Sequence, residues 1–181
     1  MTVDRRRHRN TMPIQPLYHI RELGHPDVPH IHRVMASQAE YSLRVTATPP
    51  SAADAEACLT EVPDGHSPDD LQVLGVFDEA TLVGFTVVLK HFPTPGKAHI
   101  ALLMVHADYE GQGLANALHN ELICRLKDEG DITATRLNVV ATNSIVVPFW
   151  ERLGYRETEP PRPHTAGSVQ TYVHTFERPL V

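Results

Sequence analysis

The chain has 181 residues, of which 41% are hydrophobic and 21% charged, and its formal net charge at pH 7 is −6. A chain of this length normally forms one domain that buries about two-thirds of its unfolded surface. The negative charge argues against nucleic acid as the main partner, because phosphate binding needs a clustered basic surface, and it favours a cationic ligand. No apolar run approaches the roughly 18 residues that a membrane span requires, so no membrane partner is expected.

The amino-terminal residues MTVDRRRHRN are basic and lack the apolar segment of a secretory signal. We therefore expect residues 1–12 to be a disordered basic tail, residues 13–181 to form a single domain, and the protein to be cytoplasmic. Cys58 and Cys124 have no metal-ligand spacing and are expected to be two buried thiols in a reducing compartment. His25, His30 and His32 lack the i, i+4 spacing of a helical metal site, so no metal is predicted.

The first half of the chain predicts a strand, two helices and a hairpin. Residues 17–23 indicate a strand, and residues 28–43 a helix that buries Ile31, Val34, Met35 and Leu43. A break at residues 48–51 is followed by a helix through residue 59, with Ser51 as its N-cap. Two apolar runs, 71–77 and 82–89, flank the turn 78–81 and predict a β-hairpin.

The second half alternates strands and helices. We expect a buried strand over residues 99–106, a helix over 114–129 capped by Gly130, and a strand over 136–141. A short helix over 145–153 can hold Pro148 only in its first turn, and residues 171–176 form a late strand. The proline-rich segment 160–164 is expected to be a stiff loop that in such a fold can border a ligand cleft. This order predicts a mixed α/β sheet with helices on both faces.

The most informative stretch is a glycine-bearing loop between the strand 99–106 and the helix 114–129. At a helix start, backbone N–H groups lack intrahelical partners, and the helix dipole adds partial positive charge. The small residues Gly111, Gly113 and Ala115 allow a ligand to approach the backbone itself. These features predict an anion site for a phosphate or pyrophosphate, although a tight structural connection has the same pattern. The loop contains neither a nucleotide P-loop nor a dinucleotide-binding glycine motif.

Two segments together resemble the GNAT family of N-acetyltransferases. Residues 110–115 read EGQGLA and are similar to the family's acetyl-CoA motif, in which Arg or Gln precedes two variable residues, a Gly, one variable residue and a Gly or Ala. Residues 143–155 read NSIVVPFWERLGY and are similar to the family's second motif, which stands at the same distance. The resemblance extends over residues 17–176. It implies a mixed, mostly antiparallel central sheet of six to seven strands with helices on both faces.

The resemblance also implies a set of cofactor-binding residues. Backbone groups of Leu103, Met104 and Val105 are expected to pair with the pantetheine arm of acetyl-CoA in the manner of an added strand. Asn143 is expected to contact the cofactor from the neighbouring strand. The pyrophosphate is expected on the backbone N–H groups of residues 111–116, which are Gly111, Gln112, Gly113, Leu114, Ala115 and Asn116.

Three residues depart from the family pattern. Glu110 stands where the family prefers Arg or Gln, and a carboxylate near a pyrophosphate is unfavourable unless it points away. Trp150 occupies the position of the family's Tyr general acid, and Asn138 that of a Glu base, and neither side chain can perform that proton transfer. The catalytic acid and base are thus unknown. The replacement candidates are His99, His106, Asp108 and Tyr109, all near the strand or its loop.

The leading hypothesis is acetyl transfer from acetyl-CoA, as a cosubstrate and without a metal, to a primary amine of an unidentified small molecule. A main-chain N–H near Met104 or Val105 would stabilise the tetrahedral oxyanion, an effect of about 3 kcal/mol. An acceptor amine on a protein or peptide is an alternative within the same class. A non-catalytic acyl-CoA-binding module, or a domain that binds another phosphate ligand, are alternatives from other classes. Homodimerisation is compatible with the resemblance and is not required by it.

Overall fold

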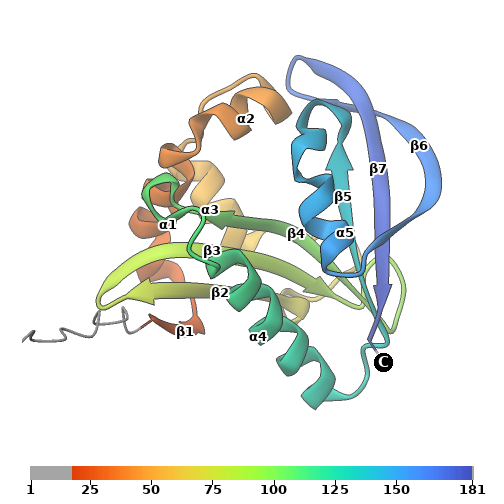
Figure 1. Ribbon diagram of the computed structural model, residues 1–181, viewed down its shortest axis with the longest axis horizontal. Helices are drawn as coiled ribbons and strands as arrows, with labels where there is room; N and C mark the ends of the chain where they lie inside the picture. The colour runs from red at the N-terminus through yellow and green to blue at the C-terminus, as the bar shows by residue number, and fades with distance from the viewer. Residues whose placement is uncertain (1–17, 181) are drawn as a thin grey trace, which may run out of the picture.

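The computed structural model describes residues 18–180, so the predicted tail at residues 1–12 and Leu17 lie outside the described residues. A central seven-stranded sheet carries helices on both faces (Figure 1). The strands are β1 (Tyr18–Glu22), β2 (Leu71–Asp78), β3 (Thr81–Lys90), β4 (Lys97–Val105), β5 (Ala134–Val140), β6 (Arg156–Ala166) and β7 (Val169–Pro179). The α-helices are α1 (Val28–Ser37), α2 (Ala39–Thr46), α3 (Ala52–Thr60), α4 (Leu114–Glu129) and α5 (Val147–Arg152). Short 3-10 helices are η1 (His25–Asp27), η2 (Pro68–Asp70), η3 (Ala107–Tyr109) and η4 (Ala141–Val146).

The strands lie in the order β1-β2-β3-β4-β5-β7-β6. Every neighbouring pair is antiparallel except β4 and β5, which are parallel. A parallel pair needs a crossover connection, and α4 supplies it. The sheet is therefore mixed and mostly antiparallel, as predicted, and its one parallel junction lies in the middle.

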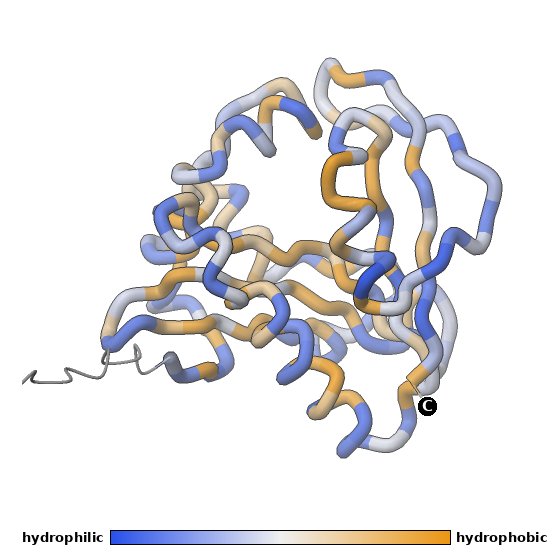
Figure 2. Tube along the Cα trace, in the orientation of Figure 1, coloured by the Kyte–Doolittle hydropathy of each residue, from blue (hydrophilic) through white to orange (hydrophobic). Residues whose placement is uncertain are grey.

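Two hydrophobic clusters hold the helices on the sheet. The first packs the leucine stripe of α4, together with Trp150 and Tyr155, against one face of the strands, and the second packs α1 and α3 against the other face of β2, β3 and β4. Figure 2 shows hydrophobic residues concentrated in the central strands and on the inner side of α4. At roughly 25 cal/mol per Å² of buried apolar surface, these clusters supply the main favourable term of folding.

Several predicted elements match the structure. The hairpin of β2 and β3 and the Ser51 cap of α3 were both expected from the sequence. Helix α4 begins and ends at the predicted residues, with Gly130 in a left-handed conformation at its end. Pro148 lies in the first turn of α5, where its missing N–H is not needed.

The prediction of one helix over residues 28–43 was wrong. The chain breaks at Gln38, which has φ −112° and ψ 36°, and this separates α1 from α2. The break shifts the helical phase, so Leu43, predicted to be buried, is 49% exposed. Ile31, Val34 and Met35 precede the break and are buried as expected.

Two further expectations were wrong. Residues 160–164 are part of strand β6 rather than a loop, and the strand accommodates them through register shifts against β7 between Glu157 and Arg162. As an edge strand, β6 tolerates the missing N–H groups of its prolines. Cys124 is exposed because its position on α4 faces away from the leucine stripe, and Cys58 is only half-buried.

Among residues 18–180, no helix has the length and hydrophobicity needed to span a membrane. Within the same residues, no three His, Cys, Asp or Glu side chains come together in a group that could hold a metal ion.

Candidate functional site

The central feature of the site is a split between β4 and β5. The two strands pair only over Lys97–Ile100 and Ala134–Leu137, and pairing stops at Ile100 and Leu137. Beyond that point β4 continues to Val105 and β5 to Val140, each still paired with its outer neighbour. The facing edges of the two strands thus carry backbone N–H and C=O groups without a ladder partner. An extended ligand with amide groups can pair there as an added strand does.

A β-bulge lies at the start of the split. Val87 of β3 pairs with Leu102 and Val88 with Ile100, so Ala101 is the extra residue on β4. The buried hydroxyl of Thr86 donates to the Leu102 carbonyl oxygen at 2.9 Å and fixes the bulged backbone. Ala101 is exposed although it belongs to the central strand. Bulges bend a strand and redirect its groups, and here the bend coincides with the parting of the sheet.

The predicted phosphate loop leads into α4 as expected. Gly111 and Gly113 have φ values of +74° and +82°, a conformation that L side chains rarely adopt. A Cβ at either position would meet no atom within 4 Å, so the conformation rather than crowding calls for glycine. The first α-helical hydrogen bond runs from the Ala117 N–H to the Gly113 carbonyl, and no side chain caps the helix start. The N–H groups of residues 114–116 are therefore directed out of the helix start, above open space.

The side chains around this loop are engaged with α1, α2 and β1. The Glu110 carboxylate accepts a hydrogen bond from the Gln38 side chain at the junction of α1 and α2. The same Gln38 amide donates to the Val105 carbonyl at 3.0 Å, which occupies one of the backbone groups expected to face pantetheine. Gln112 accepts a hydrogen bond from the Tyr18 hydroxyl at 2.7 Å. The side chain of Gln112, one of the predicted cofactor-binding residues, is thus held by β1. Its backbone groups are what remain for a ligand.

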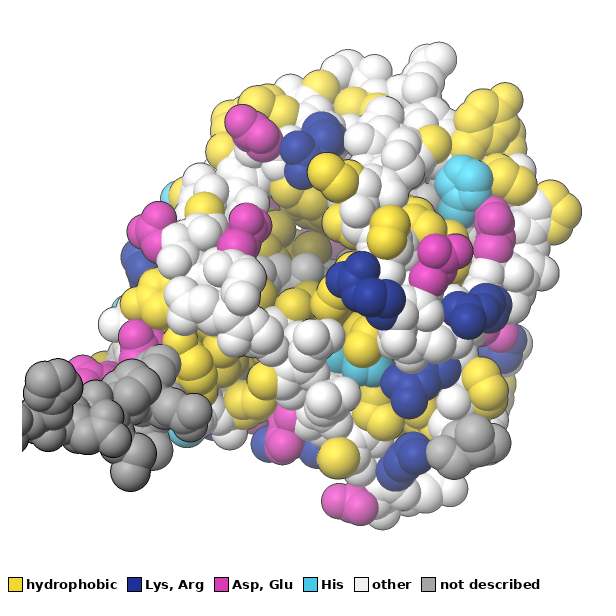
Figure 3. Space-filling view, viewed as in Figure 1, with side chains coloured by type: hydrophobic (Ala, Val, Ile, Leu, Met, Phe, Trp, Pro, Cys, Tyr) yellow, Lys and Arg dark blue, Asp and Glu magenta, His cyan; other side chains and the backbone are white. Residues whose placement is uncertain are grey.

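Asn143, predicted to reach the cofactor from the β5 side, is buried in η4 beside α2. Its Oδ1 accepts from Arg44 Nε at 3.3 Å, and the neighbouring Thr142 hydroxyl donates to the Arg44 carbonyl at 2.8 Å. A Cβ on Gly167, in the turn between β6 and β7, would lie only 2.3 Å from the Thr46 carbonyl oxygen. The end of α2 therefore contacts both η4 and the turn between β6 and β7. Helix α2 thus reaches across the split to the half of the sheet that contains β5 and β7 (Figure 1). Figure 3 shows a hollow in this region with hydrophobic side chains in its depth.

Trp150 lies in the core and not on an open edge of the split. It is 7% exposed, and its ring packs edge-on against His119, Phe149 and Tyr155 at centroid distances of 6.2, 5.0 and 5.3 Å. Because an indole N–H has no accessible pKa, Trp150 contributes packing and no proton transfer. The residue in the position of the family's acid is thus a structural one.

His99 and Arg136 are register partners on β4 and β5, in the last paired stretch before the split. The Nδ1 of His99 is buried and has no hydrogen-bond partner among the described residues, and the same holds for Nε of Arg136. Burial and the nearby guanidinium lower the pKa of His99 to about 4, so the ring is neutral at pH 7. The residue as a whole is half-buried, and its ring packs edge-on against Phe92 at a centroid distance of 5.5 Å.

The other three candidates for proton transfer have local partners. His106 Nδ1 accepts the Asp108 N–H at 3.3 Å and so caps the start of η3. The Tyr109 hydroxyl donates to Asp78 at 3.3 Å, in the turn region of the β2–β3 hairpin. Asp108 is exposed beyond the strand end. His99 is the one of the four that lies in the paired stretch of β4 and β5 just before the split.

Sequence reasoning missed four polar side chains around the split. Gln38 and Arg44 come from α2 and its start, and Arg136 and Thr175 from β5 and β7. Their polar character gave no signal, because polar residues at these spacings are typical of any solvated surface. One signal available from the sequence was Arg136, the only charged residue of β5.

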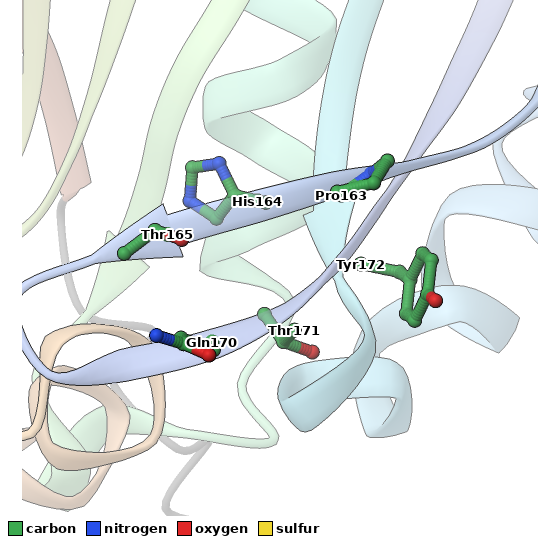
Figure 4. Close-up of a pocket in the computed structure, with 6 residues that line it drawn as sticks. All are labelled: Pro163, His164, Thr165, Gln170, Thr171 and Tyr172. Carbon is green, nitrogen blue, oxygen red and sulfur yellow. The ribbon is translucent and has the colours of Figure 1, made fainter.

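Two other hollows lie away from the split. One, of about 450 Å³, is lined on the α5 side by Pro148, Glu151, Arg152 and Arg156. The other, of about 300 Å³, is formed by the β6–β7 hairpin (Figure 4). Its sides are His164 and Thr165 of β6 and Gln170, Thr171 and Tyr172 of β7, with Pro163 beside them. Neither hollow includes a residue predicted to bind acetyl-CoA.

Comparison with known proteins agrees with this geometry. No curated protein matches the chain. Among solved structures, an acetyltransferase from Thermus thermophilus has 17% identity and a TM-score of 0.71, with 90% of this chain and 96% of that chain covered. The ribosomal-protein-S18-alanine N-acetyltransferase from Escherichia coli has 21% identity and a TM-score of 0.67, with 91% and 94% covered. A GCN5-related N-acetyltransferase from Kribbella flavida has 25% identity and a TM-score of 0.66, with 90% and 97% covered.

The family model of the acetyltransferase (GNAT) family matches residues 28–155, which include α1, the split strands and the helix start of α4. The split sheet, the bulged strand and the open helix start all fall within the matched segment. This chain is therefore a member of the GNAT acetyltransferase family.

Proposed function

We propose that this protein transfers the acetyl group of acetyl-CoA to a primary amine of a small molecule, by direct attack within a ternary complex. The observation that carries the proposal is the split between β4 and β5, which provides an unpaired strand edge next to an open helix start. Acetyl-CoA has the matching pattern of groups, because its pantetheine arm contains amides and its pyrophosphate is an anion.

The residues fit this cosubstrate in chemical type. The N–H groups of residues 111–116 would hold the pyrophosphate, where partial positive charge at the helix start favours an anion. The β4 backbone of Leu103 and Met104 would pair with the pantetheine amides, whereas the Val105 carbonyl is already bonded to Gln38. Asn143 would lie on the opposite side of the arm. Glu110 is held by Gln38, which reduces its conflict with the phosphates.

The chemistry then requires only positioning and the removal of one proton. The nitrogen lone pair of the bound neutral amine attacks the thioester carbonyl, the resulting oxyanion is stabilised by a main-chain N–H of β4, and the coenzyme A thiolate leaves. Well-oriented pairs of reactants gain up to roughly 7–11 kcal/mol from proximity alone. The nitrogen proton is then released to solvent, and His99 would be a weak acceptor for it because burial and Arg136 lower its pKa to about 4.

The proposal is tested by mixing the protein with acetyl-CoA, a panel of amines and a reagent that detects free thiols. The expected result is thiol release that depends on both the protein and the amine. Tight binding of coenzyme A in calorimetry without thiol release would instead support a non-catalytic acyl-CoA-binding module. Displacement of coenzyme A by a nucleotide at equal concentration would support a domain for another phosphate ligand.

A further inference from the structure

A second polar region lines the split on the side opposite α4. Leu137 and Val139 of β5 belong to the cluster beneath α4, so the alternate residues Arg136 and Asn138 lie on the other face of the sheet. The helices α1 and α3 make their main contacts on that face with β2, β3 and β4. Asn138 and Arg162 are exposed on this side and can be reached by an acceptor molecule, whereas Arg136 and Thr175 are buried.

Asn138 occupies the first position of β5 beyond the last pair with β4. The pairing ends at Ile100 and Leu137, and both Asn138 and Ala101, the next residue on each strand, are exposed. The side chain of Asn138 thus stands at the point where the two strands part. In the proposed reaction, this is the region in which amine and thioester meet.

The hydrogen bonds around Thr175 fix which end of the Asn138 amide is free. The Thr175 hydroxyl oxygen accepts from the guanidinium groups of Arg136 at 3.3 Å and Arg162 at 3.5 Å. A hydroxyl has one proton and two acceptor sites, so with both acceptor sites directed at cations its proton goes to Asn138 Oδ1, at 3.0 Å. The Asn138 Oδ1 is then occupied, and its NH₂ group has no hydrogen-bond partner among residues 18–180.

Two guanidinium groups and the carboxylates of Glu159 and Glu177 surround this donor. Arg162 is about half-exposed, with 55% of its side chain accessible, and it shares Glu159 with the buried Arg136. The two free N–H donors of Asn138 favour an oxygen acceptor, and the exposed Arg162 can supply a further donor to it. The oxygen must belong to the amine-bearing molecule, since the thioester is held by the other side of the split.

We propose that Asn138 and Arg162 form a subsite that binds a carbonyl or carboxylate oxygen next to the reacting amine, so that the acceptor is an α-amino carbonyl compound. This inference rests on the proposed acetyl transfer and names its acceptor class. A carbonyl on the carbon next to the amine places its oxygen close to the nitrogen, and Asn138 contacts that oxygen while the nitrogen faces the thioester. An alkylamine of the same size offers no group to this subsite.

The test compares alanine, alaninamide and sec-butylamine as acceptors for the wild-type protein and Asn138→Asp. Asp keeps the size of Asn and can still accept from Thr175, but it presents a carboxylate where the NH₂ donors were. We expect Asn138→Asp to lower kcat/KM by about 10-fold to 100-fold for alaninamide or alanine, and to change it less than about 2-fold for sec-butylamine. Each acceptor is compared between the two proteins, so differences in amine basicity cancel. If the loss of kcat/KM is larger for alanine, the ligand oxygen belongs to a carboxylate. If the loss is larger for alaninamide, it belongs to a neutral carbonyl.

Gln170→Glu is the matched control, because it adds the same charge on β7 at the far end of the hairpin (Figure 4). It should leave all three kcat/KM values unchanged. If Asn138→Asp does not fold, Arg162→Gln on the exposed surface serves instead, with the larger loss expected for alanine. Equal losses for all three acceptors would overturn the subsite and leave acetyl transfer intact. Absence of thiol release with every amine would overturn the proposed function itself.

Discussion

The hydroxyl group of Tyr155 lies 3.0 Å from Nε2 of His119, and both side chains are completely buried. The same hydroxyl is 2.8 Å from Oγ1 of Thr135, so the three polar groups form a short chain between α4, β5 and the end of α5. Burial raises the pKa of Tyr155 to about 12, and burial with the charge of Arg178 lowers the pKa of His119 to about 4. Both groups are therefore neutral at pH 7, and Trp150 covers them.

Tyr155→Phe should destabilise the protein without changing its chemistry. The substitution leaves His119 Nε2 without a partner in the interior, which typically costs about 1–3 kcal/mol, whereas the aromatic packing is retained. The free energy of unfolding, measured with urea, should fall by that amount. Tyr172→Phe is the control, because Tyr172 is 55% exposed and its hydroxyl is not buried. Equal effects of the two substitutions would show that the buried hydroxyl chain contributes nothing.

The protein should lose stability as the pH falls from 6.5 towards 4. In the folded state the pKa values of His99 and His119 are both lowered to about 4 from the usual 6.5, so the unfolded chain binds more protons within this window. Stability from these groups is complete above pH 6.5 and is lost as the pH approaches 4, by roughly 3 kcal/mol for each fully titrated group. The midpoint of urea unfolding, measured at several pH values, checks this.

His119→Gln separates the contribution of one group. The variant should be less stable than the wild type at pH 7 but should show a smaller loss between pH 6.5 and 4.5, because Gln does not titrate. His30→Gln, on the exposed side of α1, should lose as much stability over this pH range as the wild type does. If the stability of His119→Gln falls with pH as steeply as that of the wild type, the lowered pKa of His119 is contradicted.

Gly113→Leu should weaken coenzyme A binding by at least about 10-fold. The side chain would occupy the open space above the helix start and would resist the φ of +82°. The backbone strain alone costs roughly 1–2 kcal/mol of stability. Gly65→Leu is a matched control, since Gly65 has φ +84° and open space around it in a loop before β2. Both variants should lose similar stability, and only Gly113→Leu should lose affinity in calorimetry; unchanged affinity in folded Gly113→Leu would refute the phosphate site.

His99→Gln should change kcat by less than about 2-fold and leave coenzyme A affinity unchanged, because a histidine whose pKa is lowered to about 4 is a weak base at pH 7. Steady-state kinetics with an amine that supports thiol release checks this. His30→Gln again serves as the control. A loss of about 10²-fold or more in kcat that shrinks at high pH would show instead that His99 accepts the amine proton.

Local sequence patterns were sufficient for elements whose signals do not depend on distant partners. The turn between two apolar runs gave the β2–β3 hairpin, the leucine stripe and Gly130 gave α4, and the closely spaced glycines gave the loop before it. Strand β6 was missed because its prolines suppress a strand pattern, and only pairing with β7 makes it a strand. The break at Gln38 was missed because the hydrogen bonds of its side chain to Val105 and Glu110 are tertiary and leave no local pattern.

By itself the sequence determined the fold class, the family resemblance and the position of the glycine loop that opens into α4, because these depend on residues that are neighbours in the chain. Tertiary structure alone decided that Trp150 is a core residue, that His119 meets Tyr155 and that Thr175 orients Asn138. These partners are 36 and 37 residues apart. Which buried polar groups meet depends on how strands and helices pack, and periodicity along the chain carries no information about that packing.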